Sequence, residues 1–115
     1  MAKRELDALA VSALCENLAL LLGAGIQLDE AAGLLSEDSA AGPFREAART
    51  MQKALMLGES LSSAVEQTGA LPGYAVRMIA AGEKAGRTEA VLNSLARFYA
   101  YQARLQKKLR SAVVY

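Results

Sequence analysis

The sequence predicts an all-α fold, a six-helix antiparallel bundle built from three helical hairpins. Apolar residues recur at spacings of three and four along most of the chain, which is the periodicity of helices with one buried face. Residues that favour strands are sparse and scattered, whereas Ala, Leu, Glu, Lys, Arg and Gln dominate. Glycine-containing turns interrupt the helical pattern at three places. With 115 residues, the chain is expected to form a single domain with one core.

The first three helices are predicted from this apolar periodicity and from the residues that stop it. Gly23 and Gly25 end the first helix, because glycine gives the backbone the freedom to leave the helical conformation. Pro43 suits the first position of the third helix, and Gly58 closes that helix. The three predicted ranges are 6–22, 28–35 and 43–56.

The last three helices are predicted in the same way. Ser60 is the expected N-cap of the fourth helix, and Pro72 stands near the start of the fifth. Gly82 and Gly86 end the fifth helix, and one of them is expected to take a positive φ angle. Thr88 is the expected N-cap of the sixth helix, which at about 1.5 Å per residue spans roughly 40 Å and is expected to protrude. The three predicted ranges are 60–68, 72–81 and 88–112.

A quasi-repeat of helix, glycine elbow and helix predicts how the hairpins stack. The elbows are residues 22–28, 57–61 and 81–86. In an up-and-down bundle, all three elbows lie at one end and both proline-containing linkers lie at the other. The residues expected in the core are Leu18, Leu21, Leu28, Leu55, Leu61, Ile79, Leu92 and Leu95.

The composition argues against most catalytic chemistry. The chain has no histidine, so it lacks the commonest general base and the commonest zinc ligand. Its one cysteine, Cys15, excludes an intramolecular disulfide and a cysteine-built metal site. The glycine elbows match neither phosphate-binding loop pattern. We therefore expect no enzyme and no cofactor. The sequence also shows no signal peptide and no apolar run long enough to span a bilayer.

Charge divides the chain into an acidic body and a basic end. Residues 1–89 carry 8 Lys and Arg against 12 Asp and Glu, whereas residues 90–115 carry five bases and no acid. An acidic body repels phosphate, so nucleic acid is not an expected partner. Basic residues next to an apolar run mark the cytoplasmic side of a membrane segment, so we expect a transmembrane helix after Tyr115. The alternative is an ordinary solvated basic helix end. The membrane-proximal basic residues are Arg104, Lys107, Lys108 and Arg110.

Acidic residues are expected to gather loosely at the elbow end of the bundle. Hard cations bind carboxylate oxygens, so a divalent cation at this end is an open alternative. Acids beside helix N-termini are also favoured by the helix dipole without any ligand, and no spacing matches a closed metal site. The residues concerned are Asp29, Glu30, Glu59, Glu83 and Glu89.

The run Ile-Ala-Ala-Gly-Glu-Lys-Ala-Gly-Arg at residues 79–87 resembles the signature of a known family. The family is the inner-membrane platform protein of bacterial type II secretion and type IV pilus systems, and the similarity is to its cytoplasmic domains. Similar runs occur at residues 18–28, 57–64 and 92–115, so the resemblance spans about nine tenths of the chain.

This resemblance implies a non-catalytic protein-docking domain that faces the cytoplasm at the bacterial inner membrane. Such platform proteins connect the assembly ATPase to the other membrane components and to the pilin-like subunits. The ATPase and platform components are thus the expected partners, the membrane is reached through segments outside residues 1–115, and a homodimer is left open. A free-standing soluble helical adaptor that binds partner helices is the alternative function. The residues expected to contact a partner are Glu59, Gly82, Glu83, Gly86 and Arg87.

Overall fold

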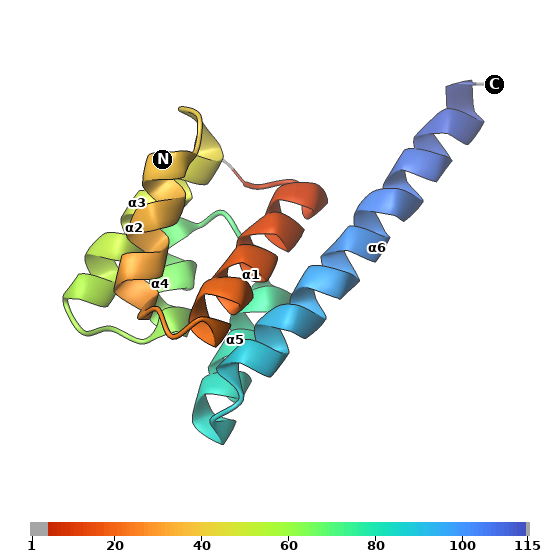
Figure 1. Cartoon of the computed structure of the whole chain (residues 1–115). Coiled ribbons are helices and arrows are strands. Elements are labelled where there is room, and N and C mark those ends of the chain that lie inside the picture. Colours follow the sequence, from red (N-terminus) through yellow and green to blue (C-terminus); the bar gives the residue numbers. More distant parts are fainter. Residues whose placement is uncertain (1–4, 115) are drawn as a thin grey trace.

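The computed structural model describes residues 5–114, and these residues form six α-helices and no strand (Figure 1). The all-α class and the six helices are therefore confirmed. Each apolar periodic segment of the sequence forms one helix. The helices are α1 (Ala8–Gly23), α2 (Leu28–Asp38), α3 (Pro43–Met56), α4 (Leu61–Thr68), α5 (Gly73–Ala85) and α6 (Thr88–Val114).

Two predicted boundaries near the last elbow are wrong. The α5 helix does not end at residue 81 but continues through Gly82 to Ala85. Thr88 is not the N-cap of α6 but its first helical residue, because the backbone N–H of Val91 already donates to the carbonyl of Arg87 at 3.0 Å. The helix continues to Ala85 because the left-handed residue that closes it is Gly86, whereas Gly82 has a helical backbone and packs closely against Val91 of α6.

The three elbows share one hydrogen-bond pattern, in which a glycine and the residue after it bond back to the last helical turn. At the end of α5, the N–H of Gly86 donates to the carbonyl of Glu83 at 3.2 Å, and that of Arg87 donates to Gly82 at 2.8 Å. This is a Schellman motif, which requires a left-handed residue. Gly86 supplies it with φ 69°, so the prediction of a positive φ angle at one of the two glycines is confirmed. Gly25 and Gly58 do the same after α1 and α3, with φ 88° and 87°.

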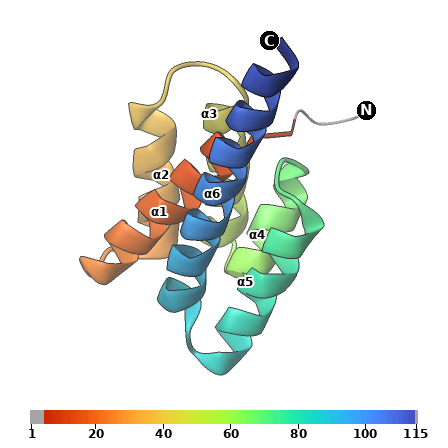
Figure 2. The same cartoon turned by 90° about the vertical axis from the view of Figure 1, so that its right-hand side faces the viewer.

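The helices do not pack mainly within the predicted hairpins. The most extensive contact joins α1 to α6, from opposite ends of the sequence, whereas α1 and α2 touch only slightly. The next largest contacts join α2 to α3 and α3 to α4. The stacking of three hairpins is therefore not confirmed. Figure 2 shows the elbows after α1 and α5 at the lower end of the molecule, and the α2–α3 and α4–α5 connections at the upper end.

All six helices contribute buried side chains to the core, and most of its predicted members are found there. Five of the eight predicted side chains are fully buried, whereas Leu21, Leu28 and Leu55 are partly buried and pack against the core from outside. Cys15 is buried on the apolar side of α1, as predicted. Burial raises the pKa of its thiol to about 12, so this cysteine stays neutral and acts as a small apolar residue.

The α6 helix extends well beyond the rest of the molecule (Figure 1). Its 27 residues correspond to roughly 40 Å of helix, and the described residues measure 50 × 30 × 26 Å along their principal axes. The predicted protrusion is therefore confirmed. No helix within residues 5–114 combines the length and apolar composition needed to cross a bilayer.

Candidate functional site

Glu83, one of the five residues expected to contact a partner, holds α4 and α5 together. Its carboxylate accepts hydrogen bonds from the backbone N–H groups of Leu61 at 2.7 Å and Ser62 at 3.0 Å. The hydroxyl of Ser60 accepts from the N–H of Ser63 at 3.1 Å. The first three N–H groups of α4, which have no partner inside the helix, are thereby all satisfied. The predicted N-cap role of Ser60 is confirmed.

This arrangement gives Glu83 a structural role. A carboxylate at a helix N-terminus gains from charge-assisted hydrogen bonds and from the helix dipole. Because Glu83 belongs to the last turn of α5, its bonds fix the start of α4 against the end of α5. They also bring the elbow between α3 and α4 beside the elbow between α5 and α6. A partner contact through Glu83 stays a prediction.

Glu83→Gln is expected to lower the free energy of unfolding by about 1–3 kcal/mol, because the amide offers only one oxygen acceptor to two backbone donors. Chemical denaturation followed by circular dichroism measures the loss. The matched control is Glu59→Gln. Glu59 is exposed and, within residues 5–114, its carboxylate accepts from the side chains of Ser63 and Gln67, so its change is expected to stay within about 0.5 kcal/mol. Equal stabilities of the two variants would argue against the capping role of Glu83.

The other residues predicted to contact a partner differ in exposure. Glu59, Gly86 and Arg87 are exposed at the elbow end. Gly82 is buried, and a Cβ atom there would lie 2.6 Å from Cγ2 of Val91 on α6. Gly82 therefore lets α5 and α6 approach closely. The partner contacts of the whole set stay predictions.

The acidic residues at the elbow end do not form a metal site within the described part of the chain. Residues 5–114 hold no group of three or more acidic or cysteine side chains placed to share a cation. Glu83 is engaged with the backbone of α4. Glu89, in the first turn of α6, lies against Gly23 at the end of α1.

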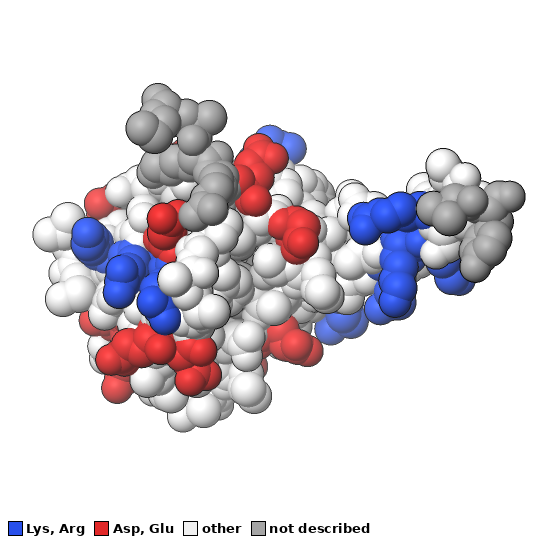
Figure 3. All heavy atoms as spheres, turned by 90° about the horizontal axis from the view of Figure 1, so that it is seen from above, with Lys and Arg blue, Asp and Glu red and all other residues white. Residues whose placement is uncertain are grey.

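The predicted membrane-proximal basic residues all lie on the projecting part of α6. Arg104, Lys107, Lys108 and Arg110 are exposed. In Figure 3 this projection carries basic side chains and no acidic ones on the face shown, whereas acidic side chains are spread over the body. The body in Figure 3 also carries Lys and Arg, so the structure separates a body with an excess of acids from a basic projection.

Comparison with known proteins places the chain in a family. The family profile described as "Type II secretion system (T2SS), protein F" matches residues 14–115. The chain belongs to this family. The type II secretion system protein F of Aeromonas hydrophila is 33% identical over 103 residues, which cover 86% of this chain and 26% of that protein. The type IV pilus assembly protein PilC of Thermus thermophilus is 31% identical over 99 residues, covering 86% and 24%. The chain thus spans about a quarter of the length of these relatives.

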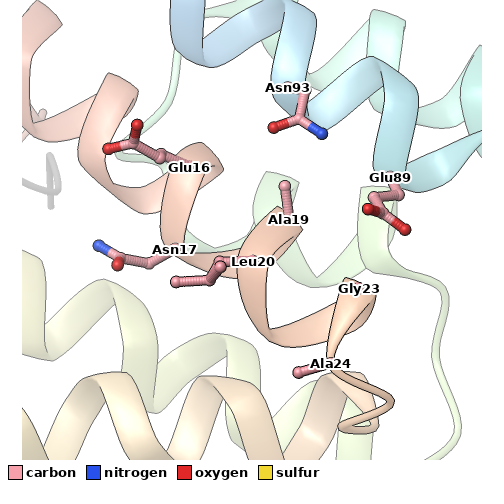
Figure 4. Close-up of a pocket in the computed structure, with 8 residues that line it drawn as sticks. All are labelled: Glu16, Asn17, Ala19, Leu20, Gly23, Ala24, Glu89 and Asn93. Carbon is pink, nitrogen blue, oxygen red and sulfur yellow. The ribbon is translucent and has the colours of Figure 1, made fainter.

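One surface of this protein F family member was missed by sequence reasoning. A hollow of about 580 Å³ lies between the second half of α1 and the start of α6 (Figure 4). A second hollow of about 330 Å³ lies between α1 and α2, and Leu20 borders both. The sequence did contain a signal for this surface. The leucines of residues 18–22 occupy more of the helix surface than one buried face needs.

Proposed function

We propose that the chain is a non-catalytic, cytoplasm-facing docking domain of an inner-membrane platform protein. In this role it couples an assembly ATPase to pilus or pseudopilus assembly. The observation that carries the proposal is the family match over residues 14–115, together with relatives named for type II secretion and type IV pilus assembly. The absence of histidine from the chain supports a role in binding rather than in acid–base catalysis.

The polarity of the molecule supports this orientation. The basic end of α6 suits the cytoplasmic side of an anionic membrane, because Lys and Arg near a membrane segment are retained on that side. The elbow end then points away from the membrane, toward soluble partners. A transmembrane helix following Tyr115 is part of this proposal and stays a prediction.

We expect the purified assembly ATPase encoded with this protein to bind the domain weakly, with an affinity that falls as salt rises. Isothermal titration at two or more salt concentrations measures this. Glu59→Lys is expected to weaken binding, since Glu59 is exposed at the elbow end and, among residues 5–114, its carboxylate bonds to side chains of α4 alone. The matched control is Glu66→Lys, an exposed acid on α4 away from the elbow. No binding at low salt, or equal effects of the two reversals, would contradict the proposal.

A further inference from the structure

Leu20 is one of two leucines of α1, with Leu9, whose side chains mostly face solvent. It is 68% exposed, whereas Leu14 and Leu18 on the same helix are 1% exposed. It stands on the ridge between the two hollows described above. On the α2 side, Leu21, Leu34 and Leu35 complete an apolar floor. We call the two hollows, together with the ridge at Leu20 that joins them, the Leu20 groove. It extends from the start of α6 across α1 to the second half of α2.

The charges on the rim of the Leu20 groove are all negative, beside the neutral Asn17 and Asn93. Every charged residue that lines the two hollows is an acid: Glu16 and Glu89 on the α6 side, Glu37 and Asp38 on the α2 side. In Figure 4, Glu89 and Asn93 project from α6 toward the end of α1. The segment that contains α1 and α2 has the same sign, since residues 5–44 contain seven Asp and Glu and no Lys or Arg. On the α6 side, Arg87 lines an adjoining hollow together with Glu89 and Asn93.

We propose that the Leu20 groove docks a basic amphipathic helix of a partner protein. An apolar floor between helices, bordered by charges of one sign, matches an apolar helix face flanked by charges of the opposite sign. Leu20 acts as the central apolar contact, and the four acids receive Lys and Arg from both edges of the incoming helix. This inference rests on the proposed docking function and assigns a surface and a partner chemistry to it.

A second copy of this chain does not fit the groove as well as another protein does. The exposed end of α6 is itself basic, but Glu89 lies at the other end of that helix. The 24 residues from Glu89 to Val113 correspond to about 35 Å of helix. A second copy could bring its basic end to the groove only in an antiparallel arrangement. The two α6 helices would then point in opposite directions, which is incompatible with the proposed entry of both into one membrane.

The test uses a synthetic 18-residue peptide of leucine and lysine, with the leucines on one helical face, titrated into the isotope-labelled protein. We expect amide shift changes at the end of α1, the second half of α2 and the start of α6. Two control peptides are a leucine–glutamate analogue and a leucine–lysine peptide of shuffled order, and both are expected to bind at least tenfold more weakly. No binding, shifts elsewhere, or equal binding of the shuffled peptide would overturn the proposal.

Matched variants locate the contact. Leu20→Ala is expected to weaken peptide binding roughly tenfold, whereas Leu9→Ala, on the same helix and 66% exposed, is expected to leave it unchanged. Glu37→Lys is expected to weaken binding more than Glu66→Lys, and circular dichroism checks that each variant is folded. Equal effects within either pair would overturn the proposal.

Two further results separate this inference from its alternatives. If sedimentation shows a dimer that Leu20→Ala dissociates, the groove belongs to a second copy and the proposal is wrong. If the ATPase binds equally to the wild type and Leu20→Ala while the peptide fails to bind, the groove is rejected and the docking function stands. If the peptide occupies the groove while the ATPase fails to bind, the groove stands and the assigned partner is wrong.

Discussion

Ile79→Ala is expected to lower the free energy of unfolding by about 2–5 kcal/mol. Ile79 lies in α5, and its side chain is 1% exposed within the main apolar cluster. Removing three carbon atoms there loses their burial and leaves a cavity that the surrounding helices can fill only in part. Equilibrium denaturation in urea, followed by far-ultraviolet circular dichroism, measures the loss.

Two other variants calibrate this result. Leu57→Ala removes a side chain that is 80% exposed, so the free energy of unfolding is expected to change by less than about 0.5 kcal/mol. Leu21→Ala should fall between the two. The sequence placed Leu21 in the core, but the structure shows it partly buried at the edge. A loss below about 1 kcal/mol at Ile79 would contradict its burial.

The helices and elbows could be predicted because their causes are local. Apolar residues at helical spacing mark the buried face of each helix, and the elbow glycines at positions 25, 58 and 86 follow directly after such a segment. A Schellman motif involves only about six consecutive residues, so its glycine is visible in the sequence. The exact end of α5 was missed because Gly82 resembles a helix stop, although its role is packing.

The packing of the helices could not be predicted because its causes are distant along the chain. Ser12 donates a hydrogen bond to the carbonyl of Ala96 at 2.7 Å, across the contact of α1 with α6 and 84 residues apart. Nothing local distinguishes this pairing from the pairing of sequence neighbours. Glu83 shows the same limit: the sequence marked it as functional, but its backbone partners lie 21 and 22 residues earlier.

The sequence predicted the charge of the candidate surfaces better than their position in the fold. Charge counts identified an acidic body and a basic end, and the structure places those charges on separate parts of the molecule. The Leu20 groove is formed by three helices, so no single segment reveals it. Only the surplus of leucine in α1 pointed toward it.

Gly82→Val is expected to lower the free energy of unfolding by about 3 kcal/mol while the separate helices still form. Gly82 has a helical backbone, so the cost comes from space: a Cβ atom would lie 2.6 Å from Cγ2 and 3.0 Å from Cβ of Val91. Those contacts are too short for carbon atoms, so α6 must move away from α5. Denaturation measures the loss, and circular dichroism in water should still show a helical protein.

A second substitution identifies the cause. Val91→Ala removes the Cγ2 atom that the added side chain would meet, so the cost of Gly82→Val should fall by about 0.5–3 kcal/mol in that background. Gly86→Val is the matched control. A Cβ atom at Gly86 meets nothing within 4 Å, but its φ of 69° costs a β-branched residue about 1–2 kcal/mol. Val91→Ala should leave that cost unchanged, because it arises in the backbone. Equal rescue of both variants, or of neither, would show that contact with Val91 is not what requires glycine at position 82.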